Sequence, residues 1–471
     1  MPITWGSNYS FCSLTTLWAP ASASPKDEYV TNEFSATVLG AVVSPIDQED
    51  GPLILTPYIE NGETEKAKAL SAVDPSLFAG VNSHAAYITV NRTANWHLFF
   101  WHFPAEGLPL EETPLVIWLQ GGPGGSSMFG MFEEIGPLQV VNNGETVERM
   151  PITWGSNYSL LFIDNPVGAG FSFTEGDEYV TNEDQVGECL LDFIQQFLQV
   201  FPELRKAPLF ITGESYAGKY IPAFGHYIQN NKDETMPINL KGVAIGDGWT
   251  DPLTLLHYAE FGEQVGLLSP EQAEDIHQME EQAKQYWKEG KYDEYKRLAP
   301  QVFTVFSNYA PVGAYNYLPK GLKSNKNHLY ISFLNKPEVQ SALHVKKMQF
   351  RSYSQKVYDN LANDIYDSVV HWLEELLEDY GVMCYNGQVD VIVAYALSVH
   401  THRSLEWSHA SEYLSKPRVP LFDDEEGRVY AYVKEYGNFM DVMVRGAGHM
   451  VPSDQPRAAK LMIDRFINKF K

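Results

Sequence analysis

The sequence predicts an α/β fold in which a central, mostly parallel sheet is flanked by helices and carries an inserted, mainly helical cap. Short apolar runs typical of buried strands alternate with longer helical patterns along most of the chain. One such strand leads through a glycine turn directly into a helix at residues 209–230. A charge-rich stretch at residues 252–345 then interrupts the alternation, as expected for an insertion between strands of one sheet.

The strand-to-helix turn carries the first candidate catalytic residue, Ser215. Residues 209–212 form a short apolar β-type run, Gly213 permits a tight turn, and a helical pattern covers residues 216–230. A serine at such a turn is pushed above the sheet edge, which is the geometry of a nucleophile elbow. The Gly-x-Ser-x-Gly pattern is incomplete because Ala217 stands at its last position. A turn serine without a catalytic role is therefore the alternative reading of this motif alone.

Candidates for the groups that a serine nucleophile needs occur elsewhere in the chain. Asp390 follows an apolar run that ends at residues 386–387, and His449 follows a strand-like run and several glycines. The block at residues 116–127 ends a buried strand in glycines, which let backbone N–H groups approach a reacting carbonyl. The order Ser, Asp, His is the order expected of an α/β-hydrolase.

Four blocks in this order resemble the signature blocks of serine carboxypeptidases, with the vitellogenic carboxypeptidase-like group as the closest match. The resemblance runs from about Leu53 to the C-terminus. The blocks are Trp118-Leu-Gln-Gly-Gly-Pro-Gly-Gly-Ser-Ser127, Asp164-Asn-Pro-Val-Gly-Ala-Gly-Phe-Ser172, Gly213-Glu-Ser-Tyr-Ala-Gly218 and Gly448-His-Met-Val-Pro-Ser-Asp-Gln-Pro456. The resemblance implies a serine-type carboxypeptidase that hydrolyses the C-terminal peptide bond of peptides or proteins through an acyl-enzyme and prefers acidic pH.

The same resemblance implies roles for individual residues. Ser215 would be the nucleophile, His449 the base and Asp390 its orienting acid. The N–H groups of Gly122 and Tyr216 would form the oxyanion hole. Gln120, Gly121 and Glu214 would bind the substrate's terminal carboxylate, with Glu214 sharing a proton with a second carboxyl group. Many relatives have Asn where Gln120 stands, which puts the position of the bound carboxylate in question.

Two other functions stay open at this point. A relative of the same fold could transfer the acyl group to an alcohol instead of to water, and the triad does not distinguish these acceptors. A catalytically silent storage or binding homologue is the other alternative. The presence of all three candidate triad residues argues against it.

Composition limits the partners. The 471 residues carry a net charge of −26, which argues against nucleic acid and anionic membranes as partners, and no apolar run approaches a membrane span. We expect peptide or protein C-termini as substrates, no cofactor and no metal. His400 and His402 suggest a metal pair on a strand, but no third ligand with suitable spacing follows. A homodimer is left open.

The three cysteines do not form a recognisable disulfide framework. Cys189 lies in a helical pattern and Cys384 in a buried strand pattern, so both are expected to be small core residues. The scarcity of disulfides favours the cytosol, whereas the family resemblance implies the secretory pathway, either lysosomal or vacuolar or extracellular. We give more weight to the resemblance.

The first residues repeat a later segment. Residues 1–10 are identical to residues 150–159, and residues 27–33 are identical to residues 177–183. A nucleotide sequence that encodes residues 160–176 gives residues 11–26 when it is read one base out of frame. Residues 1–33 are thus interpreted as an artefactual, partly frame-shifted duplicate of residues 150–183 and are expected to be disordered.

The remaining chain divides into four predicted parts. Residues 34–52 are interpreted as the remnant of a signal peptide or propeptide, with an apolar, small-residue run at 35–44. The other parts are a first core segment (53–251), the cap (252–345) with a long polar helical pattern at 270–298, and a second core segment (346–471). Asn91 and Asn157 begin glycosylation sequons in the first core segment.

Overall fold

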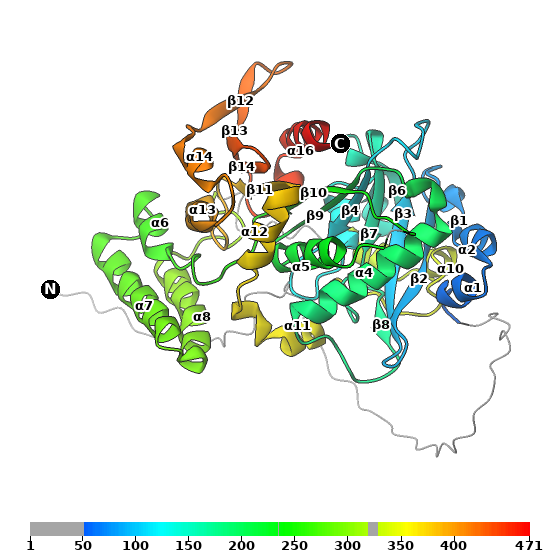
Figure 1. Ribbon diagram of the computed structural model, residues 1–471, viewed down its shortest axis with the longest axis horizontal. Coiled ribbons are helices and arrows are strands. Elements are labelled where there is room, and N and C mark those ends of the chain that lie inside the picture. Colours follow the sequence, from blue (N-terminus) through cyan, green and yellow to red (C-terminus); the bar gives the residue numbers. More distant parts are fainter. Residues whose placement is uncertain (1–50, 234, 319–327) are drawn as a thin grey trace, which may run out of the picture.

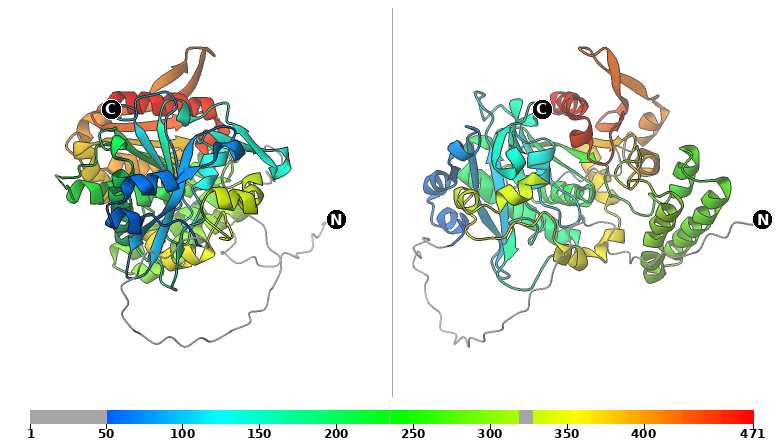
Figure 2. Two further views of the ribbon diagram at one scale, coloured as in Figure 1. Left: turned by 90° about the vertical axis from the view of Figure 1, so that its right-hand side faces the viewer. Right: turned by 180° about the vertical axis from the view of Figure 1, so that it is seen from behind.

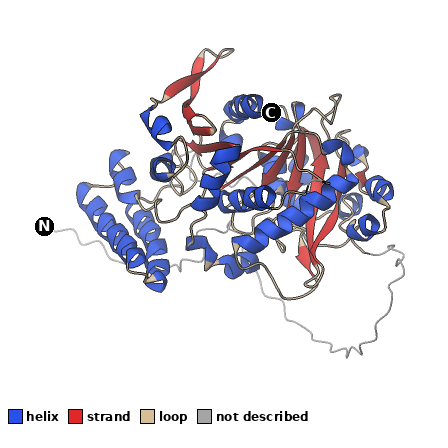
Figure 3. Cartoon of the chain, viewed as in Figure 1, coloured by secondary structure: helices blue, strands red, loops and turns tan. Residues whose placement is uncertain are grey.

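The computed structural model describes residues 51–233, 235–318 and 328–471. The predictions for residues 1–33, and for all but the last two residues of 34–52, lie outside this part of the chain. Figure 1 shows a twisted sheet at the centre, helices on both of its faces and a separate group of helices at one end. Figure 3 shows the same layering by element type.

The sheet is mostly parallel, as predicted. Within the described residues the main sheet has twelve strands: eleven follow the order β1-β2-β3-β7-β4-β9-β10-β11-β14-β13-β12, and the twelfth, β8, pairs with β3. The consecutive parallel strands are β7 (Ser159–Ile163), β4 (Leu115–Leu119), β9 (Leu209–Glu214), β10 (Leu240–Gly246), β11 (Gly381–Gly387) and β14 (Phe439–Val444). The antiparallel strands at the edges are β1 (Ala72–Val73), β2 (Ser83–Asn91), β3 (Trp96–Phe103), β8 (Phe173–Thr174), β12 (Val419–Asp423) and β13 (Arg428–Tyr436).

The parallel strands are apolar on both faces because helices cover both sides. In β4, Ile117 and Leu119 belong to one hydrophobic cluster, while Val116 and Trp118 belong to another. The first face packs against α1 (Thr56–Glu60), α2 (Thr64–Leu70), α4 (Glu183–Val200), α5 (Ala217–Asn230), α11 (Gln355–Leu361), α12 (Val370–Asp379) and α14 (Ala410–Ser415). The second face packs against α3 (Met128–Glu133), α9 (Leu329–Leu334), α10 (Pro337–Ala342), α15 (Val451–Asp454) and α16 (Pro456–Phe470).

The predicted insertion contains two groups of helices that pack differently. The helices α6 (Tyr258–Gln264), α7 (Pro270–Lys288) and α8 (Tyr292–Tyr309) form a third cluster together with α13 (Tyr395–Ser404). They stand apart from the sheet in Figure 2, whereas α9 and α10 lie against it. The polar pattern at 270–298 is two helices rather than one, because the chain turns at Gly290, where φ is +70°.

Two small strand elements were not predicted. The hairpin of β12 and β13 extends the sheet and projects from the body of the molecule (Figure 1). A separate pair, β5 (Leu138–Val141) and β6 (Thr146–Arg149), lies next to α3 and α9. Cys189 and Cys384 are free and buried, which confirms their prediction as core residues.

The register of the parallel strands brings four loops to one edge of the sheet. Glu214 at the end of β9 pairs with Gly246 of β10, Gly246 pairs with Tyr385 of β11, and Tyr385 pairs with Val442 of β14. The chain segments that follow these strand ends carry Ser215, Asp247, Asp390 and His449. The carboxyl ends of parallel strands are where open α/β sheets build their sites.

A buried ion pair anchors α5, the helix that follows Ser215. The fully buried Lys219 donates to the side chain and the carbonyl oxygen of Asp364, and the Tyr216 hydroxyl also donates to the Asp364 carboxylate, at 3.1 Å. A buried charge that loses its partner destabilises a protein strongly.

We expect Lys219→Met to lower the free energy of unfolding by about 3–5 kcal/mol, because it leaves the Asp364 carboxylate buried without its cation. Urea denaturation followed by tryptophan fluorescence would measure the change. Lys206→Met is the matched control, since Lys206 pairs with Glu111 at 3.2 Å on the exposed surface and should contribute little. Equal effects of the two substitutions would contradict the role of the buried pair.

Candidate active site

Ser215 occupies a strained turn between β9 and α5. Its φ of +62° lies in the left-handed region, which residues other than glycine rarely adopt. The turn is fixed from both sides: the Ser215 N–H donates to the Gly246 carbonyl at 2.8 Å, and the Trp249 N–H donates to the Ser215 carbonyl at 2.9 Å. The structure thus gives Ser215 the strand–turn–helix setting that the sequence predicts for a nucleophile elbow.

The glycine block after β4 lies directly against this turn. A Cβ atom on Gly121 would stand 2.6 Å from both the Ser215 Cβ and the Tyr216 nitrogen. No side chain fits there, so the backbone of residues 121–122 can approach the serine closely. Gly122 has a φ of +129°, a conformation that favours glycine.

The amides of Gly122 and Tyr216 are available to an incoming oxygen. Neither N–H donates to another group among the described residues. Tyr216 stands at the N-terminal cap of α5, where unpaired N–H groups and the helix dipole favour negative charge. An oxyanion formed on a carbonyl next to Ser215 would find such donors here.

His449 and Asp390 form a buried hydrogen-bonded pair. The Nδ1 atom of His449 lies 2.8 Å from Oδ2 of Asp390. The Asp390 carboxylate also accepts N–H groups of its own loop, from Ile392 at 3.1 Å and Val393 at 3.2 Å. These bonds fix the carboxylate, which in turn fixes the imidazole and its tautomer. The other ring nitrogen of His449, Nε2, has no hydrogen-bond partner among the described residues.

The charges around His449 favour its protonated form. Burial lowers the pKa of His449, but the adjacent Asp390 and the nearby Glu214 outweigh this effect and raise the pKa above its usual 6.5. The ring also stacks on Tyr315 at a centroid distance of 5.0 Å, and the backbone N–H of His449 donates to the backbone carbonyl of Tyr315 at 2.7 Å. His449 is therefore held by Asp390, on the loop after β11, and by Tyr315 of the inserted segment.

Glu214, immediately before the serine, is part of a buried polar group. The Gln120 side-chain amide donates to Oε1 of Glu214 at 2.7 Å, and the Trp118 indole donates to the Gln120 oxygen at 2.9 Å. Glu134, at the C-terminal cap of α3, is buried against Glu214. Both Glu134 oxygens and Oε2 of Glu214 lack any other hydrogen-bond partner among the described residues.

A proton shared between the two carboxyl groups would join one oxygen of Glu134 to Oε2 of Glu214. Burial raises the pKa of Glu214 to about 7, against the opposing effects of His449 and Gln120, and burial together with Glu214 raises the pKa of Glu134 well above its usual value. Two adjacent buried carboxylates cannot both stay ionised, so at acidic pH this pair carries protons that it can donate. Glu134 is the partner carboxyl that the sequence did not identify.

The second signature block has a structural function. Asp164, at the end of β7, is fully buried and accepts the Ser126 hydroxyl at 2.6 Å, the Ser127 N–H at 3.0 Å and the Phe171 N–H at 2.8 Å. It thereby ties the glycine block to the loop at residues 166–172. This carboxylate orients the backbone that lies next to Ser215 without reaching the serine itself.

Three functional neighbours carry no clear sequence signal. Glu134 lies seven residues beyond the glycine block, and Tyr315 lies in an irregular part of the insertion. Asp247 stands between two glycines after β10, where it reads as an ordinary turn residue. Each becomes recognisable only when the fold brings it to the strand ends. Of these three residues, only Asp247 has a local sequence indication of its position, because the segment Gly246-Asp247-Gly248 ends a predicted buried strand.

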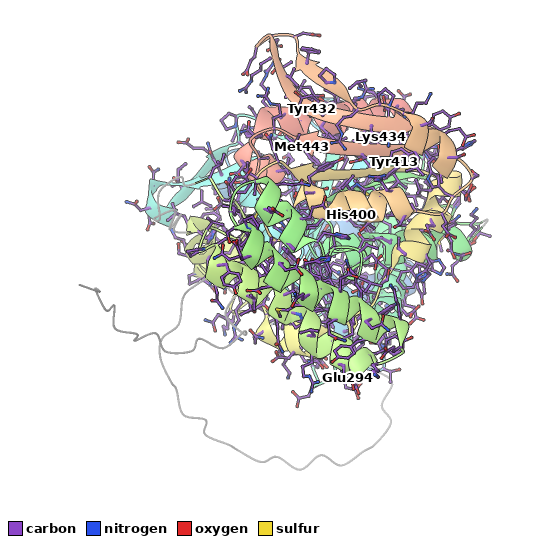
Figure 4. The ribbon with its side chains drawn as sticks, turned by 90° about the vertical axis from the view of Figure 1, so that its left-hand side faces the viewer. Glu294, His400, Tyr413, Tyr432, Lys434 and Met443 are labelled. Atoms are coloured by element: carbon purple, nitrogen blue, oxygen red, sulfur yellow. The ribbon has the colours of Figure 1, made fainter. Side chains whose placement is uncertain are left out.

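His400 and His402 lie on the helix α13, not on a strand, so the prediction of their setting was wrong. Figure 4 places His400 between the helices of the insertion and the sheet. His400 stacks on His257 at 3.5 Å with an interplanar angle of 4°, and Glu260 lies 3.5 Å from His400 and 3.8 Å from His257. His402 is buried elsewhere, beside Asp441.

The stacked histidines are poorly arranged for a metal ion. A histidine ligand binds zinc in its ring plane at about 2.0–2.1 Å. The two ring centroids here are 3.5 Å apart and the ring planes differ by only 4°, so the in-plane lone pairs of the two rings do not converge on one ion. Burial lowers the pKa of His257 to about 4 and also lowers that of His400, which keeps both rings neutral and lets them stack.

Comparison with known proteins gives one consistent result. Residues 75–469 match the family model described as serine carboxypeptidase. The chain is 38% identical to the vitellogenic carboxypeptidase of Aedes aegypti, over 97% of this chain and 96% of that protein. It is 42% identical to the probable serine carboxypeptidase CPVL of Homo sapiens, over 88% of this chain and 89% of that protein.

A solved structure shows the same fold. The crystal structure of Kex1(delta)p, a prohormone-processing carboxypeptidase from Saccharomyces cerevisiae, matches with a TM-score of 0.76 and 25% identity, over 85% of this chain and 96% of that one. The fold class predicted from the sequence is therefore confirmed.

The carboxyl pair predicts how stability depends on pH. Both pKa values are raised on folding, so the folded protein binds protons more tightly than the unfolded chain, and stability is lost as pH rises from about 4.5 towards 7. Each unit by which the folded-state pKa exceeds the unfolded-state pKa lowers the free energy of unfolding at high pH by about 1.4 kcal/mol.

We expect the melting temperature to fall between pH 5 and pH 8, and to fall less in Glu134→Gln, because glutamine cannot lose a proton. Differential scanning calorimetry would measure both curves. Glu148→Gln, at an exposed position in β6, is the control and should follow the wild-type curve. A Glu134→Gln curve as steep as that of the wild type would contradict the proton-sharing pair.

Proposed function

The chain belongs to the serine carboxypeptidase family, and we propose that it releases the C-terminal amino acid from peptides through an acyl-enzyme on Ser215, with a preference for acidic pH. The main support for action at the C-terminus and at acidic pH is the buried group of Gln120, Glu134 and Glu214 next to the candidate nucleophile. Cleavage of internal bonds would not need a protonated carboxyl pair at this position. Such a pair can donate a hydrogen bond to a free carboxylate, which suits recognition of a substrate's C-terminus.

In the proposed reaction the Ser215 hydroxyl attacks the carbonyl carbon of the last peptide bond, and its proton passes to Nε2 of His449. Asp390 stabilises the imidazolium that forms. The N–H groups of Gly122 and Tyr216 stabilise the oxyanion. When the C–N bond breaks, His449 gives the proton to the leaving amino group. Water then hydrolyses the acyl-enzyme by the same steps, with His449 again as base.

The chain position of Glu214 supports action at the terminus. Glu214 and Ser215 are adjacent, so a carboxylate bound by Glu214, Gln120 and the Gly121 N–H would lie about one residue from the attacked carbonyl. A protonated carboxyl group can donate a hydrogen bond to that carboxylate, whereas an ionised one repels it. Because the pKa of Glu214 is about 7, substrate binding should weaken as pH rises beyond neutrality.

We also propose entry into the secretory pathway. A relative 38% identical over 89% of this chain is named venom serine carboxypeptidase, from Apis mellifera. Of the two sequons, Asn157 is exposed, and the side chain of Asn91 is half-buried and accepts the N–H groups of Thr93 at 3.0 Å and Ala94 at 2.9 Å. We propose both as glycan sites. Within the described ranges, no helix is both long and apolar enough to cross a bilayer.

We expect the full chain to release the terminal amino acid from an N-blocked dipeptide, with kcat/KM highest at acidic pH and KM rising above about pH 7. The same dipeptide with a C-terminal amide should lose about 10- to 100-fold in kcat/KM at pH 5, since it lacks the charged hydrogen-bond acceptor. Chromatographic measurement of the released amino acid at several pH values would test this.

Two variants serve as controls. Ser215→Ala should abolish release, and Glu214→Gln should remove the rise of KM above pH 7, because its amide donates but does not ionise. Equal hydrolysis of the free and amidated dipeptides would contradict the carboxylate-binding role. Transfer of the acyl group to an added alcohol, with little hydrolysis, would instead indicate an acyltransferase.

A further inference from the structure

A second buried carboxyl group lies against the triad. Asp247 follows β10, is fully buried and has a φ of +44°. Its N–H donates to the Tyr385 carbonyl at 2.7 Å, and its Oδ1 accepts the Gly387 N–H at 2.9 Å. Its Oδ2 has no partner among the described residues. An unpaired carboxylate oxygen in such a place is costly unless it carries or receives a proton.

A carboxylate oxygen of Asp247 lies close to the triad acid, Asp390. Carboxylate oxygens of Asp247 and Asp390 and a ring nitrogen of His449 all lie within 4.8 Å of one another, so the charge of Asp390 acts directly on Asp247. Asp390 already accepts bonds from His449 and from two amides of its loop. A proton on Asp247 would add one more hydrogen-bond donor to those that already surround the single negative charge of Asp390.

Within the part of the chain that the structure describes, the groups that face Asp247 do not include a cation of its own. The ionisable groups that face it are Asp390 and His449 on the loops after β11 and β14, Glu214 at the end of β9 and Tyr385 in β11. The ionisable groups that face Asp390 from the insertion are the tyrosines Tyr258 and Tyr315. Two acidic groups in contact, with His449 bonded to only one of them, cannot both be ionised.

We propose that Asp247 is a positioning residue that keeps its proton, donates it in a hydrogen bond to Asp390, and so sets the pH at which His449 can act as the base. The inference rests on the proposed roles of Ser215, His449 and Asp390. Burial, with Asp390 as the next cause, raises the pKa of Asp247 well above its usual range, which agrees with a proton retained through neutral pH.

The effect on His449 follows from electrostatics. A hydrogen bond from Asp247 spreads the charge of Asp390, so Asp390 stabilises the imidazolium less. An ionised Asp247 would add a second negative charge and raise the pKa of His449 further. With a protonated Asp247, His449 thus stays neutral down to a lower pH than it would beside an ionised Asp247. That matters here because the Glu134–Glu214 pair binds a carboxylate only while it is protonated, below about pH 7.

The test uses a fluorophosphonate, which reports the reactivity of Ser215 without needing a substrate carboxylate. We would measure its labelling rate between pH 4 and pH 9 in the full chain, in Asp247→Asn and in Asp247→Gly. Asparagine keeps a donor and cannot ionise, and glycine removes the donor while tolerating the positive φ. We expect Asp247→Asn to follow the wild-type curve and Asp247→Gly to label roughly tenfold more slowly on the acid limb, with its midpoint at higher pH.

A second readout detects the proton itself. The infrared difference spectrum of wild type minus Asp247→Asn at pH 7 should contain the C=O stretch of a protonated carboxyl group. The absence of this band, an Asp247→Gly midpoint equal to that of the wild type, or an Asp247→Asn midpoint displaced as far as that of Asp247→Gly would each overturn the proposal. Normal wild-type labelling without release of a C-terminal amino acid would overturn the proposed substrate and leave the role of Asp247 standing. A wild type that does not label would overturn both.

Discussion

The strained turn at Ser215 is the constraint on which the rest of the site depends. Its left-handed φ of +62° is held by hydrogen bonds to Gly246 and Trp249, so the ends of β9 and β10 must meet closely. Close packing in turn excludes a side chain at Gly121. The same turn gives Glu214 and Tyr216 opposite positions: Glu214 ends the strand beside Gln120 and Glu134, and Tyr216 caps the helix with an amide that has no partner among the described residues.

Burial raises the pKa of three carboxyl groups at the site, those of Glu134, Glu214 and Asp247. Glu214 lies against Glu134, and Asp247 lies close to Asp390. In each proposed pair, one shared proton would remove the repulsion that two charges would cause. The pairs differ in what faces them: Gln120 approaches the first, and His449 approaches the second. The proposed reaction at acidic pH would require the first pair to be protonated and His449 to be neutral, so the two titrations would have to overlap.

Much of the site could be predicted because its motifs are local. The turn at Ser215, the glycines at 121–122 and the loops of Asp390 and His449 each end a strand with a recognisable pattern, and parallel strand ends meet at one edge. Glu134 could not be found in this way, since its partner Glu214 is 80 residues away in sequence. The split of α7 and α8 was missed because both helices share one polar composition, and only Gly290 separates them.

The inserted segment is part of the site and not merely a cover over it. After α8, the Ala314 carbonyl accepts the N–H groups of Val391 and Ile392 at 3.1 and 3.0 Å, and the Tyr315 carbonyl accepts the His449 N–H at 2.7 Å. The loops of the acid and of the base are therefore bonded to the same stretch of backbone. Because Val391 and Ile392 directly follow Asp390, a displacement of this stretch would change the hydrogen bond between His449 and Asp390. The helices α6 to α8 can vary in sequence at their exposed faces, but the segment that joins them to the triad has to keep its position.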